Sequence, residues 1–447
     1  MSKQKIIAGI DIGSSKTTTL IASLGEEGEK PKVIGVASIP SQGIRKGQIV
    51  DIEEASETVV QSVEAAERMA GYNLNRAFVA VNGAHINSQN SKGVVAVAEP
   101  EGEITQEDVK RVIDAAQAVS LPSSREIIHV LPRYYTADGQ EGIKDPMGMS
   151  GVRLEIETHI ITGSTTSIRN LTKCVSEMGV DVQDLVAGGL ASAESVLSDT
   201  EKELGVVLVD IGGGTTNIVV YVEGAVFYTS VLPIGAKNVT NDLAIGLRLS
   251  SLQVAEKIKI VLSTKAKRPT LPNLGAEQLT EIKKEEKKQE KDEEKDEDEI
   301  DLAKLGITEE ARTVSRKTLT EGIIKPRLNE IFTMVGMEIK KSNAGGLTPA
   351  GIVVCGGGAQ TVGVVDAAKR ILAMPVRIGQ PQRLNGLVDD ILTSDFATAT
   401  GLVLYGARAD LKPGVSFSFS RISKKFQKLP VKGIAGKALN LIKSFLP

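Results

Sequence analysis

The sequence predicts an α/β protein built from two similar lobes. The chain has 447 residues, more than one hydrophobic core usually organises. A short motif, GIDIGSSKTTT at residues 9–19, returns as LVDIGGGTTNIVV at residues 208–220. Each copy opens a strand–turn–strand pattern that precedes residues with helical spacing. We therefore expect each lobe to begin with the same structural device.

The first half of the chain contains the first copy and a change of pattern behind it. After residue 83 the pattern switches to short strands around one helix, so we expect an inserted α+β module from 83 to about 165. The expected elements are strand, turn and strand at 5–25, a strand at 32–39, a helix at 51–69, a strand at 77–82, a helix at 106–119, strands at 127–135 and 154–161, a helix at 166–178, a strand at 180–186 and a helix through 194.

The second half repeats the device from Gly205 onward. Helical spacing follows over 238–262 and 315–341, and then a strand ends in the glycine run VVCGGGAQ before a helix at about 360–372. Residues 265–305 are densely charged, which predicts a solvated and partly disordered excursion; the alternative is one exposed charged helix. Within it, residues 281–301 hold 12 acidic and 6 basic side chains.

Composition excludes several classes of protein. Aromatic residues make up 3% of the chain and tryptophan is absent, which argues against base stacking on single-stranded nucleic acid. The only two cysteines, Cys174 and Cys355, are too far apart to suggest a disulfide framework or a zinc site. No run of about 18 apolar residues predicts a membrane-spanning helix. We expect a cytoplasmic protein in which His85, His129 and His159 are structural.

The two turns have the chemistry of a phosphate clamp. Turn amides and hydroxyl groups donate hydrogen bonds to phosphate, and a lysine adds positive charge. Asp11 and Asp210 end the two strands, and carboxylates there suit Mg²⁺, which keeps most of its waters. A plain hairpin uses the same residue types, but two copies favour the clamp. The candidate phosphate-binding residues are Gly13, Ser14, Ser15, Lys16, Thr17, Gly212, Gly213, Gly214, Thr215 and Thr216.

The third glycine run, Gly356, Gly357 and Gly358, follows a strand and opens a predicted helix. Unpaired amides and the positive end of the helix dipole favour a nucleotide at that position. The run lacks the spacing of a dinucleotide-binding fold, so it could also be only a tight turn.

These motifs, in this order, resemble those of the actin, heat-shock chaperone and sugar-kinase superfamily. Within it, the chain resembles the FtsA family of bacterial cell-division proteins along almost its whole length. The stretches VDIGGGTTNIVVY and VSRKTLTEGIIKPRLNEIF are especially similar to that family. The resemblance implies an actin-like fold of two ribonuclease-H-like lobes around ATP and Mg²⁺, with an inserted 1C subdomain of the SHS2 type. It assigns Glu256 and Lys259 to the ribose and adenine; a surface ion pair is the alternative. Many relatives carry Glu-Pro where this chain has Gly188 and Gly189, so we expect slow or negligible hydrolysis.

The same resemblance divides the chain into subdomains. The expected boundaries are 1–82 with 166–200 and 384–410 for subdomain 1A, 83–165 for 1C, 201–237 with 320–383 for 2A, 238–319 for 2B including the excursion, 411–430 for a basic linker and 431–447 for a terminal helix.

The last residues form a predicted amphipathic helix. From residue 411 to the end there are eight Lys and Arg and no Asp or Glu. At about 100° per residue the apolar side chains share one arc, which describes a helix lying on an anionic membrane; a helix docked on the protein's own core is the alternative. The residues expected to bind the membrane are Ile434, Leu439, Leu441, Ile442, Phe445, Leu446, Lys437 and Lys443.

The resemblance implies a protein that polymerises with itself and tethers the tubulin-like protein FtsZ to the inner face of the cell membrane, at the division site and with other division proteins. It implies that the FtsZ C-terminal peptide binds subdomain 2B, where Arg316 and Lys317 are the candidate contacts. No nucleic-acid partner is expected. A sugar-kinase-like enzyme and a pilus-assembly scaffold of the same fold are the alternatives.

Overall fold

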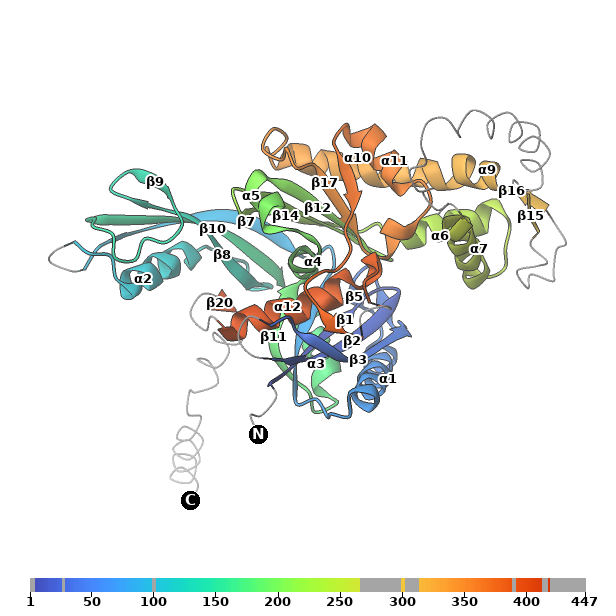
Figure 1. Cartoon of the computed structure of the whole chain (residues 1–447), viewed down its shortest axis with the longest axis horizontal. Coiled ribbons are helices and arrows are strands. Elements are labelled where there is room, and N and C mark those ends of the chain that lie inside the picture. Colours follow the sequence, from blue (N-terminus) through green and yellow to red (C-terminus); the bar gives the residue numbers. More distant parts are fainter. Residues whose placement is uncertain are drawn as a thin grey trace, which may run out of the picture.

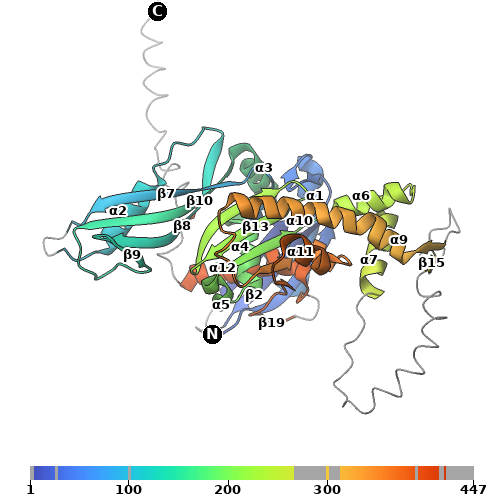
Figure 2. The ribbon, with the colours of Figure 1, turned by 90° about the horizontal axis from the view of Figure 1, so that it is seen from above.

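Two sheets with the same strand order form the centre of the molecule. The computed structural model describes residues 5–25, 29–98, 102–265, 299–301, 313–387, 391–411 and 417–418. The inserted module lies at one end of the long axis, and the helices that follow the second sheet lie at the other (Figures 1 and 2). The predicted α/β class is confirmed.

The first sheet belongs to lobe 1 and has the order β11-β6-β1-β2-β3-β19. β1, β2 and β3 are antiparallel, whereas β6 and β11 continue the sheet in parallel to β1. Most of β1 and β2 is buried on both faces, which matches their β-branched sequence. The strands are β1 (Lys5–Ile12), β2 (Lys16–Leu24), β3 (Lys32–Pro40), β6 (Arg76–Val81), β11 (Asp181–Ala187) and β19 (Asn385–Gly386).

The second sheet belongs to lobe 2 and has the order β14-β13-β12-β17-β18. Three antiparallel strands are again followed by two parallel ones, so the sequence repeat corresponds to a repeat of topology. Asp11 and Asp210 occupy the same place, the second-last residue of the first strand. The strands are β12 (Val206–Ile211), β13 (Thr216–Val222), β14 (Ala225–Leu232), β17 (Ile352–Cys355) and β18 (Val376–Ile378).

Helices cover both sheets. Asp51 caps the first of them by accepting a hydrogen bond from Glu54, and Gly71 ends it in the left-handed conformation. The helices of lobe 1 and of the lobe junction are α1 (Ile52–Ala70), α3 (Thr165–Ser176), α4 (Gly188–Val196), α5 (Asp199–Leu204), η4 (Ser394–Phe396) and α12 (Ala397–Leu411). Those of lobe 2 are α6 (Ala236–Gly246), α7 (Leu252–Lys265), α9 (Arg316–Leu319), η2 (Thr320–Ile324), α10 (Lys325–Lys341), η3 (Gly357–Gln360) and α11 (Val364–Leu372). Two short strand pairs complete the fold: β4 (Ile44–Arg45) with β5 (Gln48–Ile49), and β15 (Glu299–Asp301) with β16 (Thr313–Ser315).

The inserted module has its own sheet and core. Its sheet has the order β20-β8-β10-β7, and β9 pairs with β8. One helix packs on the sheet so closely that a Cβ on Gly93 would lie 2.3 Å from the carbonyl oxygen of Val112. The elements are β7 (Asn87–Ala96), α2 (Gln106–Gln117), β8 (Arg125–Ala137), β9 (Gln140–Ile143), β10 (Arg153–Ser164) and β20 (Phe417–Ser418).

Three predicted helices differ from the observed ones. The stretch 238–262 is two helices, α6 and α7, because the chain turns between them and Arg248 adopts a positive φ of 53°. The stretch 315–341 contains a π-helical turn, η2, between α9 and α10. The helix expected from residue 360 begins only at Val364, after the short 3₁₀ helix η3.

Some predictions lie outside the described residues. The excursion at 265–305 is described only at residues 265 and 299–301, and the terminal helix at 431–447 not at all. Of the linker, residues 411 and 417–418 are described. Within the part of the chain that the structure covers, no helix is long and apolar enough to cross a bilayer. The subdomain boundaries also stay a prediction.

Two histidines are buried in and beside the inserted module. His129 and His159 are each 1% exposed. The His159 ring contacts Asn90 at 2.7 Å and Thr229 at 3.0 Å, and the backbone N–H of Ala187 donates to His129 at 3.0 Å. Burial lowers the pKa of His129 to about 4 and that of His159 to about 3. Both rings therefore stay neutral at neutral pH, in keeping with a structural role.

These lowered pKa values predict how stability depends on pH. As pH falls below about 6.5, the unfolded chain binds protons that the folded chain refuses, so the free energy of unfolding decreases. For His159 alone the loss between pH 7 and pH 5 is about 2 kcal/mol. Denaturant unfolding of His159→Gln should show a pH dependence weaker by that amount, whereas the exposed variant Lys257→Gln keeps the original dependence. Parallel curves for His159→Gln and the unchanged chain would contradict the prediction.

Candidate functional site

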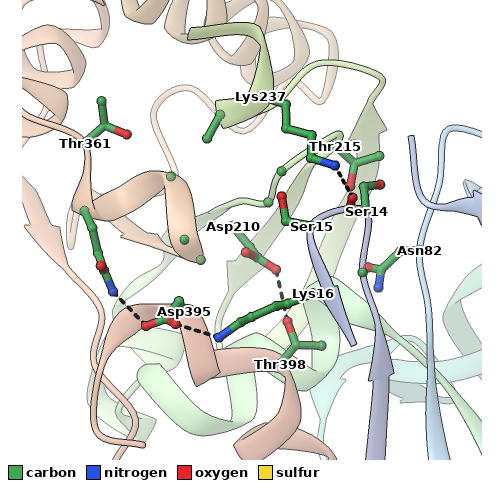
Figure 3. Close-up of a pocket in the computed structure, with 18 of the residues that line it drawn as sticks. Ser14, Ser15, Lys16, Asn82, Asp210, Thr215, Lys237, Thr361, Asp395 and Thr398 are labelled. Carbon is green, nitrogen blue, oxygen red and sulfur yellow. Dashed lines mark hydrogen bonds and ion pairs between the residues drawn. The ribbon is translucent and has the colours of Figure 1, made fainter. Parts of the chain in front are cut away.

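A cavity of about 430 Å³ lies where the two lobes meet. It contains parts of both predicted turns, of the third glycine run and of α7 (Figure 3). Residues far apart in the sequence therefore share one site. The predicted residues that line it are Asp11, Gly13, Ser14, Ser15, Lys16, Asp210, Gly212, Gly213, Thr215, Glu256, Lys259, Gly356, Gly357 and Gly358.

Three predicted residues are not brought to the cavity wall. The hydroxyl group of Thr17 lies 2.9 Å from that of Ser41. The hydroxyl group of Thr216 donates to the carbonyl oxygen of Ile234 at 2.9 Å. Gly214 packs against Ser14, where a Cβ would lie 2.8 Å from its hydroxyl oxygen. Thr17 and Thr216 therefore use their hydroxyl groups within their own lobes, whereas Gly214 lies at the contact between the two turns.

The two turns have matching geometry. The N–H of Gly13 donates to the carbonyl of Lys16 at 3.1 Å, and the N–H of Gly212 donates to that of Thr215 at 2.8 Å. None of the glycines in these turns adopts a left-handed φ. Glycine is needed for another reason: a Cβ on Gly213 would lie 2.2 Å from the hydroxyl oxygen of Ser15 in the other lobe. The glycines allow the turns to touch.

Asp210 is buried and Asp11 is half-buried, and both line the cavity. Burial, followed by the charge of Asp210, raises the pKa of Asp11 to about 7, although Lys16 and Asn82 lower it. Burial also raises the pKa of Asp210, despite hydrogen bonds from Ser192, Asn217 and Thr398. A bound cation would stabilise the charged form of two carboxylates that lie close together with little access to water.

Two asparagines, which sequence reasoning missed, connect these carboxylates across the lobes. Asn82 donates to Asp11 at 3.2 Å, and Asn217 donates to Asp210 at 3.3 Å and to the amide oxygen of Asn82 at 3.4 Å. The amide oxygen of Asn217 is buried and has no partner among the described atoms. The pair Gly188 and Gly189 makes room for them, because a Cβ on Gly188 would lie 2.0 Å from the amide oxygen of Asn82.

The residues present fit a magnesium ion. Mg²⁺ is usually held by one or two carboxylates together with water and phosphate oxygens. Asp11 and Asp210 supply two carboxylates whose pKa values are raised, chiefly by burial. The structure groups no three His, Cys, Asp or Glu side chains into a metal cluster within its described ranges, so a closed cage of protein ligands is not indicated.

The cavity contains three lysines with different surroundings. Lys16 donates to Asp395 at 2.6 Å and lies 3.7 Å above the centre of the Phe396 ring. Those contacts hold the pKa of Asp395 below its usual range, although its burial alone would raise it. Lys259 pairs with Glu256 at 2.7 Å. Lys237, at the start of α6, instead donates to the carbonyl oxygen of Ser14 at 2.5 Å (Figure 3).

Glu256 and Lys259 lie on one face of α7, as their spacing predicts. Both line the cavity, and both contact Thr240 of α6. They form an ion pair, but on the cavity wall and with Lys259 only 7% exposed. Their position agrees with a role beside a sugar or base.

The third glycine run reaches the cavity through close packing. Gly356 has a φ of +82°, and a Cβ there would lie 2.3 Å from a carboxylate oxygen of Asp210. The run opens only the four-residue η3, so the expected dipole of a regular helix is not available there. The cavity residues that were not among the predicted site residues are Gly47, Asn82, Asn217, Ala236, Lys237, Ile260, Ser263, Gln360, Thr361, Asp395 and Thr398.

The candidate peptide contacts lie outside this cavity. Arg316 begins α9 and donates to the carbonyl oxygen of Leu262 in α7 at 3.5 Å. Lys317 follows it and is exposed. Both lie at the end of the molecule opposite the inserted module (Figure 2).

Family models match most of the fold. The model described as "SHS2 domain inserted in FTSA" matches residues 83–162, and the model "Cell division protein FtsA" matches residues 207–401. Among solved structures, a PilM–PilN type IV pilus biogenesis complex aligns with a TM-score of 0.60 at 14% identity, over 90% of this chain and 98% of that one. That likeness concerns the fold alone.

Curated relatives match almost the whole chain. The cell division protein FtsA of Pseudomonas aeruginosa is 39% identical over 416 residues, covering 93% of this chain and 92% of that protein. FtsA of Bacillus subtilis is 34% identical over 431 residues, covering 96% and 90%, and FtsA of Escherichia coli is 35% identical over 415 residues, covering 91% and 92%. With its two matching sheets and inserted SHS2 module, this chain belongs to the FtsA family of actin-like cell-division proteins.

Proposed function

We propose that this protein binds ATP and Mg²⁺ between its lobes, polymerises, and tethers FtsZ to the inner face of the cell membrane. One observation carries the proposal: two matching turns, each with a strand-ending aspartate, line the same cavity from opposite lobes. Membership of the FtsA family supports a role for the chain in cell division.

Different cavity residues would bind different parts of the nucleotide. The turns offer amides and the hydroxyl groups of Ser14, Ser15 and Thr215 to phosphates. Glu256 and Lys259 would hold the ribose and adenine. Asp11 and Asp210 would hold Mg²⁺, which neutralises phosphate charge when bound. No carboxylate stands at Gly188 or Gly189 to act as a base, so we expect tight binding and slow hydrolysis.

The metal role of the two carboxylates can be tested by nucleotide binding. In Asp210→Asn, ATP affinity in Mg²⁺ should fall at least about tenfold, since the ion loses a charged ligand. In EDTA the same variant should bind ATP as well as the unchanged chain or better, because one negative charge beside the phosphates is gone. Asp11→Asn should behave alike, and the exposed variant Asp114→Asn should change neither value. An equal gain from Mg²⁺ in all four proteins would contradict the metal site.

The membrane role rests on the C-terminal residues and on where the chain leaves the fold. β20 pairs antiparallel with β8, with Phe417 opposite Val130 and Ser418 opposite His129. The last described residue, Ser418, therefore lies at the edge of the inserted module's sheet. Attachment of many such tails through one polymer would be far firmer than attachment of one, because later contacts become intramolecular.

Liposome co-sedimentation tests the tether. With anionic vesicles and ATP, the full chain should pellet and bring FtsZ with it, whereas a chain ending at Lys428 should leave both in the supernatant. The full-length variant Ile442→Asp, which places a charge on the apolar face, should behave like the shortened chain. If full and shortened chains pellet equally, or neither pellets, the tether is wrong.

Charge reversal tests the peptide site. Lys317 is exposed, whereas Arg316 is half-buried and donates to the backbone of α7, so we choose Lys317 for its exposure. Binding of a labelled FtsZ C-terminal peptide, followed by fluorescence anisotropy, should weaken several-fold in Lys317→Glu. Lys369→Glu, on the exposed face of α11, serves as the control. Equal affinities for both variants would remove Lys317 from the site.

A further inference from the structure

Lys237 reaches across the junction of the lobes. It belongs to lobe 2, at the second residue of α6, and its ammonium group donates to the carbonyl oxygen of Ser14 in lobe 1 at 2.5 Å. Figure 3 shows this side chain extending from α6 toward the first turn, beside Thr215. The ammonium thus lies where the two turns approach each other.

The start of α6 has its backbone amides already in use. The N–H of Ala236 donates to the carbonyl of Gly212 at 2.9 Å, and the N–H of Lys237 donates to that of Gly213 at 2.8 Å. A Cβ on Gly235 would lie 2.5 Å from the carbonyl oxygen of Gly212, so only glycine allows α6 to sit this close to the second turn. Anion binding at this end of α6 is therefore left to the side chain of Lys237.

Lys237 differs from the other cavity lysines in its charge balance. Lys16 is paired with Asp395 and Lys259 with Glu256. Within the described residues, no carboxylate lies at ion-pair distance from the ammonium of Lys237; its partner is a neutral carbonyl. Loss of water contact lowers the pKa of Lys237, an effect that Glu256 opposes and Lys259 reinforces. An anion in the cavity would therefore interact with a lysine that forms no ion pair with a described carboxylate.

The carbonyl that Lys237 contacts is part of a fixed structure. The hydroxyl oxygen of Ser14 accepts a hydrogen bond from the N–H of Gly47 at 2.8 Å, and Ser14 lies against Gly214 of the other turn. A hydrogen bond from an ammonium to a phosphate oxygen is stronger than one to a neutral carbonyl. If a phosphate bound at this point, the ammonium of Lys237 would donate to a phosphate oxygen in place of the carbonyl oxygen of Ser14.

We propose that Lys237 binds the terminal phosphate of a nucleoside triphosphate and keeps its contact with Ser14 when a diphosphate is bound. The inference rests on the proposed nucleotide site. Within that site, Lys237 gives selectivity for the triphosphate over the diphosphate. Lys237 is then both a phosphate ligand and a bridge between the lobes. It exchanges one inter-lobe contact for another made through the nucleotide.

The experiment compares ATP and ADP affinities of the full chain by fluorescence titration, in Mg²⁺ and in EDTA. In Lys237→Gln, ATP affinity should fall about tenfold or more while ADP affinity changes by less than about threefold. Lys237→Arg, which keeps the charge, should retain most of the preference for ATP. Lys257→Gln, an exposed lysine of α7, is the matched control and should alter neither affinity. Unchanged thermal unfolding without nucleotide establishes that each variant is folded.

The outcomes separate the two proposals. If the unchanged chain binds neither nucleotide, the proposed function fails. If it binds both and Lys237→Gln weakens ATP and ADP equally, or weakens neither, then nucleotide binding stands and the terminal-phosphate role of Lys237 is overturned.

Discussion

The contact between the two turns is the constraint on which the rest of the site depends. Ser14 and Ser15 of lobe 1 lie against Gly213 and Gly214 of lobe 2 with no room for a Cβ between them. This approach brings Asp11 and Asp210 to one cavity, where burial and the charge of Asp210 raise the pKa of Asp11. The folded chain therefore holds two carboxylates close to each other at its centre, and a bound cation would stabilise the contact that brings them together.

The hydrogen-bonding groups around the carboxylates limit that cost without removing it. Asn82 and Asn217 each donate to one carboxylate, and Ser192 of α4 donates to Asp210 at 2.9 Å. Donors of this kind favour the charged form, yet the pKa of both aspartates stays raised because the effect of burial is larger. The neutral amides keep the side chains oriented, and a bound cation would add the positive charge that they lack.

The sequence predicts the repeated parts of this structure better than the unique ones. The two motifs predicted matching sheets because buried strands have a recognisable hydrophobic pattern, and that pattern occurs in both copies. Lys237, Asn82 and Asp395 come from stretches with no such pattern, and only the tertiary fold brings them to the cavity. The glycines of the two turns have no left-handed φ, and the need for glycine there comes from the opposite lobe, which no local sequence reveals. The turn at Arg248, whose positive φ the sequence pattern does not reveal, separates α6 from α7.

The inserted module connects the lobes a second time. It is covalently part of lobe 1, but it binds the edge of the lobe 2 sheet: Ser88 donates to the carbonyl of Thr229 at 2.7 Å, and His159 contacts the hydroxyl group of Thr229 at 3.0 Å. Thr229 lies on β14, opposite Val219 of β13, the strand that starts at the second turn. A change in the separation of the lobes must therefore bend the module's strands or break these hydrogen bonds. Since a packed sheet resists bending, the position of the module depends mechanically on the same turns that form the cavity.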